Sequence, residues 1–509
     1  MAKRRKRDVL PVLMACALVL SGGFSANAQT RITVGVTETI ETQNPYGDSV
    51  SLLYGIWSEI TGPFCTYNYA KGDFEGRLAE KWKVENPTTW VFSLSKNYKF
   101  NDGSSVTADD VVHSLMTRVI SDPQSKQKAS VAPSVVKAEA ADKFTVKITT
   151  DKPTAPLLSF LCDRLIVTSK AAFDKYGRDA ADKEHMMGGG PYQLKELIPG
   201  QRLVIAKRPD HPDAKKNPRA PDEVVYRIMR EPEQRITALL NDEVQIAQFV
   251  PPHMRQRVEK SKNLKIAPVD SVEIMFLAMQ PKPPFDKKEV RQAVCHAINR
   301  DQIISTLLEG FASRLDGPLG PGQYGYDANL KPKMSFDPEK SKKLLAQAGF
   351  PNGVDIELQT PVGRYTLDKQ LTEAMIPMLN AAGLRAKLLT PEWATLWASV
   401  QKGTIPFYYM GRGSVQDPSA ALHQYFHTGE TPRIGYSNPK LDELLDKEQQ
   451  EFDAKKRRQY LSQAMSILTD DAPACFMWRH KLLWGLSNRV EYKPLPDARI
   501  YAVEMAVRR

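Results

Sequence analysis

Short segments in which polar and apolar residues alternate, or which are continuously apolar, recur along this 509-residue chain. Both patterns are typical of β-strands with one or two buried faces. They predict strands at 31–36, 89–94, 143–149, 202–206, 224–229, 244–249, 272–279 and 355–358.

Segments with helical periodicity lie between these strands, and they predict helices at 153–161, 231–240, 288–300, 337–348 and 368–382. Thr107 is expected to cap a further helix, because Asp109 and Asp110 follow it in the first turn. Gly349 and Gly383 are expected to end the last two helices. The alternation of strands and helices predicts α/β domains with mostly parallel sheets.

The N-terminus has the pattern of an export signal. A basic stretch at 3–7 precedes a mostly apolar run at 9–24, and the sequence Ala-Asn-Ala at 26–28 suits a signal peptidase. The apolar run is shorter than the roughly 18–20 residues that span a bilayer, and Pro11 interrupts it. We therefore expect cleavage after Ala28 and an exported mature protein.

Leu13-Met14-Ala15-Cys16 offers an alternative, because it resembles a lipoprotein processing box in which Cys16 would be acylated. The residues that follow Cys16 stay apolar through Leu20, whereas a mature lipoprotein usually becomes polar there. Cleavage after Ala28 is therefore the favoured interpretation.

Composition limits the class of protein. About 480 residues remain after cleavage, more than the roughly 250–300 that one hydrophobic core organises, so two or more domains are expected. The formal net charge is +11, and residues 3–8 supply part of it. Elsewhere Lys and Arg are mixed with Asp and Glu, as at 442–448, which is typical of solvated helix faces and argues against nucleic-acid binding.

Four cysteines remain in the mature chain: Cys65, Cys162, Cys295 and Cys475. None has CxxC spacing, and four over this length do not form a dense disulfide framework. Buried small side chains are the favoured interpretation, and one disulfide is the main alternative.

The sequence has no strong motif for phosphate binding, metal binding or nucleophilic catalysis. The triplet 188–190 (Gly-Gly-Gly) is followed by Pro191 and Tyr192 instead of the Lys-Ser/Thr of a phosphate loop, so a structural turn is expected. His423 and His427 would share a helix face, but no third ligand is evident nearby, so no metal and no cofactor are expected. No nucleophile motif is present, which argues against an enzyme.

Nine short motifs follow one another in a fixed order along the chain: 78–82 (LAEKW), 89–94 (TWVFSL), 99–103 (KFNDG), 106–111 (VTADDV), 188–192 (GGGPY), 235–244 (RITALLNDEV), 290–298 (VRQAVCHAI), 337–345 (DPEKSKKLL) and 348–353 (AGFPNG). In their order and spacing they resemble the family-5 extracellular solute-binding proteins, the dipeptide-, oligopeptide- and nickel-binding receptors of ABC importers. The resemblance covers nearly the whole mature chain.

The resemblance implies the two-lobed α/β fold of type II periplasmic binding proteins, in the large class with an extra inserted α/β subdomain. Two connections, near 269–279 and 475–486, would cross between the lobes and allow hinge closure. The expected division is a signal peptide at 1–28, a lobe I core at 29–53, 186–268 and 482–509, an inserted subdomain at 54–185, and lobe II at 269–481.

The resemblance also points to charged ligand contacts. In peptide-binding relatives an aspartate in a similar Asp-Pro segment pairs with the ligand's ammonium group, which makes Asp417 a candidate; the alternative is a turn or capping role before Ser419. Arg364 and Arg412 are candidate carboxylate binders, because guanidinium offers planar, bidentate donors. Gly411-Arg412-Gly413 departs from the Gly-Trp pair that relatives often carry.

Aromatic side chains complete the predicted site. Trp393 and Trp397 lie four residues apart and would share one helix face, while Tyr408 and Tyr409 lie on a predicted strand. Each could line a ligand pocket or pack in a core.

The sequence therefore predicts a periplasmic receptor, monomeric, that captures peptides or peptide-like solutes and delivers them to ABC permease subunits in the inner membrane. Two alternatives stay open: a receptor for a membrane sensor or chemotaxis complex, and an ABC receptor for a non-peptide solute such as an opine, an oligosaccharide or a metal chelate. An exported hydrolase is disfavoured.

Overall fold

The computed structural model describes residues 30–38, 40, 41, 43–47, 51–128, 134–413 and 417–508. The predicted signal peptide and Cys16 lie outside these residues. Among the helices in the described ranges, none combines the length and the apolar character needed to cross a membrane.

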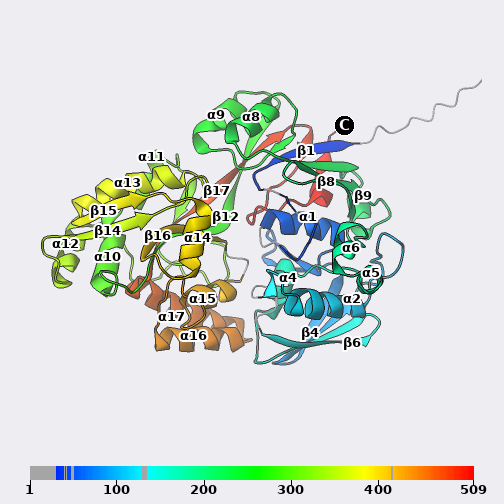
Figure 1. Cartoon of the computed structure of the whole chain (residues 1–509), viewed down its shortest axis with the longest axis horizontal. Helices are drawn as coiled ribbons and strands as arrows, with labels where there is room; N and C mark the ends of the chain where they lie inside the picture. The colour runs from blue at the N-terminus through cyan, green and yellow to red at the C-terminus, as the bar shows by residue number, and fades with distance from the viewer. Residues whose placement is uncertain are drawn as a thin grey trace, which may run out of the picture.

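A mixed sheet of eleven strands runs through the molecule in the order β15-β14-β16-β12-β17-β11-β1-β10-β9-β8, with β13 paired to β17 beside this path (Figure 1). Its strands are β1 (Arg31–Val36), β8 (Tyr192–Ile198), β9 (Arg202–Lys207), β10 (Glu223–Ile228), β11 (Ile246–Ala247), β12 (Leu264–Met279), β13 (Ala312–Arg314), β14 (Val354–Gln359), β15 (Leu384–Leu389), β16 (Phe407–Gly413) and β17 (Ala474–Ser487).

The predicted predominance of parallel pairing is wrong. Only β1 with β10 and β11, and β14 with β15 and β16, pair in parallel. The other pairs of this sheet are antiparallel, including the long β12–β17 ladder. Part of the reason is topological: the short turn between β8 and β9 permits only antiparallel pairing, and β12 and β17 carry the chain in opposite directions.

Strands β12 and β17 connect two halves with separate hydrophobic cores (Figure 1). We call these halves lobe I (described residues 30–263 and 488–508) and lobe II (280–473). Figure 1 shows them side by side, with β12 and β17 passing between them. The fold is therefore the two-lobed α/β architecture predicted from the sequence.

Lobe II surrounds β14, β15 and β16 with eight helices: α10 (Lys288–Ala297), α11 (Arg300–Thr306), α12 (Pro338–Gln347), α13 (Asp368–Ala381), α14 (Trp393–Gln401), α15 (Ser419–Phe426), α16 (Pro439–Gln450) and α17 (Ala454–Asp471). The helix predicted at 288–300 ends at Ala297, because Ile298 is extended and the Asn299 side chain caps a new helix. Cys295 in this lobe and Cys475 on β17 are free and buried, as the favoured interpretation predicts.

Lobe I carries α1 (Ser51–Thr61) and a second, antiparallel sheet in the order β4-β5-β7-β6. The elements between α1 and β8 are β2 (Cys65–Asn68), β3 (Asp73–Gly76), β4 (Ala79–Asn86), β5 (Thr89–Leu94), α2 (Ala108–Val112), a π-helical turn η1 (His113–Ser121), β6 (Val135–Asp142), β7 (Thr145–Thr150), α4 (Leu157–Arg164), α5 (Lys170–Tyr176) and α6 (Arg178–Lys183).

The rest of lobe I consists of short elements: α7 (Pro212–Lys216), α8 (Pro232–Leu240), η2 (Pro252–Met254), α9 (Arg255–Glu259), β18 (Val490–Glu491), η3 (Ala502–Glu504) and β19 (Ala506–Val507). The predicted cap of α2 is confirmed, because Thr107 and Asp110 form a capping box in which the Thr107 amide donates to the Asp110 carboxylate at 2.9 Å.

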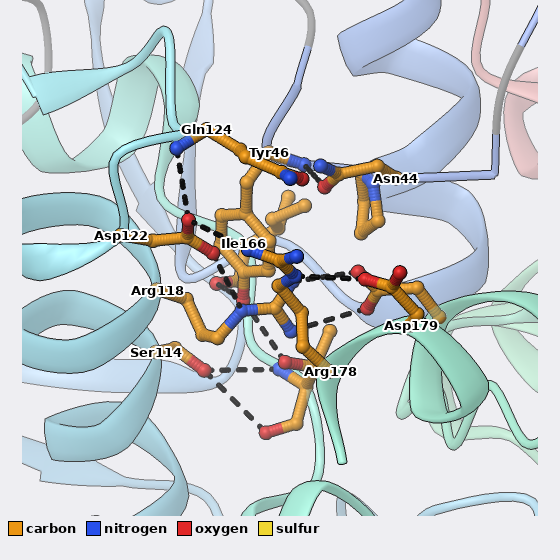
Figure 2. A network of polar contacts seen from close by, with 12 residues as sticks. Asn44, Tyr46, Ser114, Arg118, Asp122, Gln124, Ile166, Arg178 and Asp179 are labelled. Carbon is orange, nitrogen blue, oxygen red and sulfur yellow. Dashed lines mark hydrogen bonds and ion pairs between the residues drawn. The ribbon is translucent and has the colours of Figure 1, made fainter.

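A buried ion-pair network fixes part of lobe I (Figure 2). The Arg118 guanidinium donates to both carboxylate oxygens of Asp182, at 3.1 and 2.7 Å, and lies 4.5 Å from the centre of the Tyr46 ring. Asp122 accepts a further contact from Arg118 at 3.7 Å and one from Arg178 at 3.4 Å. The network ties α6 and the segment at 43–47 to η1, so it is structural.

Cys65 and Cys162 form a disulfide that joins β2 to α4 across 97 residues of sequence. For this pair the favoured interpretation of buried free thiols is wrong, and the alternative of one disulfide is correct. The pairing depends on the packing of α4 against β2, which cysteine spacing alone does not reveal.

The glycine triplet at 188–190 is a structural turn, as predicted. A Cβ on Gly188 would lie 2.0 Å from the Ile60 carbonyl oxygen, and one on Gly190 would lie 2.2 Å from that of Glu59. The Arg208 guanidinium donates to the carbonyl groups of Gly188 and Gly190 at 3.1 and 3.0 Å. Glycine is therefore required here for close packing against α1.

Candidate functional site

The predicted site residues come from the part of lobe II that faces lobe I. Arg412 lies near the end of β16, Trp393 and Trp397 lie on α14, and Asp417 precedes α15. Figure 1 shows α4 of lobe I at the edge that faces α14 and α15. The candidate site is therefore at the boundary between the lobes.

Trp393 and Trp397 share one face of α14, as predicted, and their rings stack with centroids 5.5 Å apart and planes 18° from parallel. The Glu392 carboxylate caps the helix by accepting from the Ala394 amide at 2.7 Å. Both tryptophans are only partly buried, so this aromatic pair has ring surface available for a ligand.

Arg364 lies at one end of the tryptophan pair. Its guanidinium carbon is 5.3 Å from the Trp393 ring centroid and 5.2 Å from that of Tyr365. The buried Asp368 carboxylate accepts the amides of Arg364 and Tyr365 at 2.8 and 3.0 Å, and the Tyr365 hydroxyl donates to the Gly411 carbonyl at 3.2 Å. These bonds hold the loop that carries Arg364 against β16.

The Arg412 guanidinium forms no ion pair with any described residue. Its guanidinium carbon lies 5.6 Å from the Tyr425 ring centroid, and its Nε is buried with no hydrogen-bond partner among the described residues. Burial lowers the pKa of Arg412, and the nearby positive charges of Arg164 and Arg433 lower it further. A narrow, largely apolar pocket beside Arg412 is lined by Ile274, Phe276, Pro318, Leu319, Pro418, Ala421, Leu422, Tyr425, Phe426 and Phe476.

Sequence reasoning missed Arg433, which lies at the other end of the tryptophan pair. Its guanidinium carbon is 4.8 Å from the Trp397 ring centroid and 5.5 Å from that of Tyr425. The Arg433 carbonyl accepts from the Tyr408 hydroxyl at 3.0 Å and from the Gln280 amide at 2.7 Å. The backbone of Arg433 is thus fixed independently of its side chain.

Glu273 on β12 was also missed. This partly buried carboxylate has a raised pKa because burial penalises its charge and Glu38 repels it, although Arg364 and Arg412 oppose the shift. Gly411 lets the carboxylate approach β16, since a Cβ there would lie 3.0 Å from the Glu273 carboxyl carbon. The boundary between the lobes thus holds the acidic side chain of Glu273 near Arg364 and Arg412.

Asp417 already has a cationic partner within the protein. Its two carboxylate oxygens accept from Arg457 at 2.5 and 2.7 Å, and Oδ1 also accepts the Ser419 amide at 3.0 Å. Glu448 contacts the same guanidinium at 2.9 Å. The structure thus contains the alternative predicted for Asp417, a turn role before Ser419. A ligand ammonium group would have to bind Asp417 beside Arg457.

Tyr408 and Tyr409 are fully enclosed on opposite faces of β16. Tyr408 packs in the core that includes Tyr425, and Tyr409 packs in the core that includes Trp478. Both rings are 0% exposed. The ligand contacts predicted for them would require these side chains to become accessible.

The two lobes touch directly at the side away from β12 and β17. The Ala155 amide of lobe I donates to the Gln449 carbonyl of lobe II at 2.8 Å, and the rings of Trp90 and Phe452 lie 6.1 Å apart. The Lys152 ammonium lies 3.8 Å from the Asp446 carboxylate. These contacts make the boundary between the lobes enclosed on this side.

His423, His427 and Asp446 form the group of possible metal ligands in the described ranges, with ligand atoms within 4.8 Å of one another. The structure thus supplies a third side chain that the sequence did not suggest. However, the imidazole rings stack 13° from parallel, so their in-plane lone pairs do not converge, and the His423 Nε2 lies 3.0 Å from the Leu445 carbonyl. Packing explains this pair better than metal binding.

A separate cavity of about 390 Å³ lies within lobe I. Gln43, His185, Tyr192 and Lys195 are among its lining residues. None of the predicted site residues contributes to it.

Two α/β lobes joined by two strands, with cations and aromatic rings gathered where the lobes face each other, define the class of two-lobed binding proteins. A family model for bacterial extracellular solute-binding proteins, family 5, matches residues 73–433. The chain belongs to this family, as its motifs predicted.

The sequence identity between this chain and individual relatives is low. The glutathione-binding protein GsiB of Escherichia coli O6:K15:H31 is 26% identical over 98% of each chain. The "Probable D,D-dipeptide-binding periplasmic protein DdpA" of Escherichia coli K12 is 27% identical over 96% of each chain. The crystal structure of a dipeptide-binding protein from Pseudoalteromonas sp. SM9913 with Met-Leu superposes with a TM-score of 0.82 at 21% identity, covering 94% of this chain and 100% of that one.

Proposed function

We propose that this protein captures peptides or peptide-like solutes between its two lobes and delivers them to the permease of an ABC importer. The observation that carries the proposal is the composition of the boundary between the lobes. Arg364, the Trp393–Trp397 pair and Arg412 come from lobe II, and Arg164 of lobe I lies close enough to Arg412 to lower its pKa. A ligand there would contact both lobes at once.

The chemistry of these groups suits a peptide. Guanidinium groups such as Arg364 bind carboxylates, and partly exposed tryptophan rings such as Trp393 and Trp397 contact side chains of varied shape. Glu273 and Asp417 are the carboxylates that we propose for an ammonium end, with Asp417 shared between Arg457 and the ligand. GsiB and DdpA, which are named for glutathione and D,D-dipeptides, support ligands of this size.

We propose a cellular location and partners that match this function. An N-terminal signal cleaved after Ala28 would release the receptor into the periplasm as a monomer, with permease subunits of the inner membrane as its partners. The receptor would bind its solute without chemical change. We also propose the lobe and subdomain limits expected from the sequence, with 54–185 as the inserted subdomain.

Mass spectrometry of small molecules released from the natively purified protein tests this function. We expect a peptide or peptide-like solute, and we expect the same compound to raise the thermal unfolding midpoint when it is added back. A sugar or a metal chelate as the sole bound compound would contradict the peptide proposal. Turnover of the bound compound by the purified protein would contradict binding without chemistry.

A further inference from the structure

Resting on the function proposed above, we propose that Arg412 and Arg433 form a subsite for an acidic group of the captured solute. The ligand class is therefore narrower than peptides in general: it consists of peptides or peptide-like solutes that carry a carboxylate in addition to the one expected at Arg364.

The partly buried Arg412 lacks the carboxylate or carbonyl partners that hold other enclosed arginines in the described part of the chain. Arg457 binds the carboxylates of Asp417 and Glu448, and Arg235 donates to four backbone carbonyl groups. Arg412 has an enclosed Nε without a partner and no carboxylate within ion-pair distance among the described residues. A partly buried cation without a counter-charge is unfavourable, and a bound anion would reduce that cost.

Arg433 converges on the same place from another segment. Its guanidinium carbon and that of Arg412 lie 5.5 and 5.6 Å from the centre of one ring, that of Tyr425. Its Nη1 donates to the Tyr425 hydroxyl at 3.4 Å, a long and weak bond. Both guanidinium groups thus lie near one aromatic ring, and Arg433 is close enough to lower the pKa of Arg412, a repulsion that a shared anion would relieve.

The charge around this subsite is positive on both lobes. Arg164, on α4 of lobe I, adds a third cation close enough to depress the pKa of Arg412. The nearest acid from lobe I, Asp163, is already engaged by Arg164 at 3.1 Å and by Arg499. Glu273 interacts electrostatically with Arg412 but forms no ion pair with it among the described residues. An acidic ligand group would therefore supply the direct counter-charge that Arg412 and Arg433 lack there.

Isothermal titration calorimetry with Ala-Glu and its uncharged isostere Ala-Gln tests the subsite, with Ala-Ala as the reference peptide. We expect the wild-type protein to bind Ala-Glu about tenfold or more tightly than Ala-Gln, because a charge-assisted hydrogen bond contributes at least that much. In Arg412→Gln and in Arg433→Gln the preference for Ala-Glu over Ala-Gln should fall to roughly threefold or less.

Arg385→Gln is the matched control, because it removes an arginine charge from an exposed position of the same lobe, where Arg385 pairs with Asp355. It should keep the full preference for Ala-Glu. Equal affinity of the wild type for Ala-Glu and Ala-Gln would overturn the subsite while leaving the receptor function intact, as would a preference that survives both Arg412→Gln and Arg433→Gln. Failure of all three peptides to bind would instead overturn the proposed peptide function and, with it, the subsite.

Discussion

Asp417 and Arg457 form a bidentate ion pair, with nitrogen–oxygen distances of 2.5 and 2.7 Å, that is almost completely buried in lobe II. Burial acts to lower the pKa of Arg457, but Asp417 and Glu448 outweigh it and raise this pKa. The pair anchors the start of α15 to α17. The residue with the strongest family argument for ligand binding is therefore also part of the internal structure.

Replacing Arg457 by Gln should destabilise the protein by about 3–5 kcal/mol, because Asp417 and Glu448 would remain buried without their cation. Urea unfolding followed by circular dichroism measures this free energy. Arg458→Gln, at the neighbouring exposed position of α17, is the control and should change stability by less than about 0.5 kcal/mol. Equal stability of both variants would show that the buried pair contributes nothing.

Glu59 on α1 should make stability depend on pH. Burial raises its pKa from the ordinary 4.5 to about 8, and its carboxyl accepts the Val503 amide at 2.9 Å. The folded state thus keeps a proton that the unfolded state releases near pH 4.5, so this group's stabilising contribution is present below that pH and is lost as the pH rises to about 8.

The variant Glu59→Gln removes this titration. It should unfold with a free energy at pH 8 that exceeds the wild-type value by roughly 4 kcal/mol, and the difference should shrink towards pH 4.5. Glu85→Gln, on the exposed strand β4, serves as the control. Parallel pH profiles for wild type and Glu59→Gln would contradict the prediction.

The Cys65–Cys162 disulfide should contribute about 2–5 kcal/mol to stability, because it closes a loop of 97 residues in the unfolded chain. Dithiothreitol should lower the thermal unfolding midpoint of the wild type and leave that of the Cys65→Ala/Cys162→Ala double variant unchanged. A midpoint that dithiothreitol does not shift in the wild type would exclude a stabilising disulfide.

The contact between Trp90 and Phe452 should favour association of the lobes. Phe452 is 39% exposed, so Phe452→Ala removes its ring with little effect on the cores. We expect small-angle X-ray scattering of the ligand-free variant to give a larger radius of gyration than the wild type, with the difference disappearing at saturating peptide. Val136→Ala, an exposed apolar residue on β6, is the control.

The local sequence pattern predicted elements best where neighbours in the chain decide the structure. The strand at 89–94 matches β5, and the spacing of Trp393 and Trp397 placed both rings on one face of α14. By contrast, the strand expected at 244–249 shrinks to Ile246–Ala247, since Phe249 adopts a left-handed backbone with φ of 52°.

The features that the local pattern did not predict depend on contacts between residues far apart in the sequence. The first half of β12 contains Pro268 and lacks a clear pattern, yet pairing with β17 extends this strand back to Leu264. Arg433 carries no local signal, because it joins the site only through rings on α14 and α15. Likewise, the partner of Asp417 lies 40 residues away, and only the folded chain brings Arg457 to it.

A crystal structure of the protein with Ala-Glu would test the central claim most directly. The account predicts the peptide between the lobes, with its side-chain carboxylate on Arg412 and Arg433 and its ends near Arg364 and Glu273. Ala-Glu bound on one lobe alone, for example in the lobe I cavity lined by Gln43 and Lys195, would contradict it.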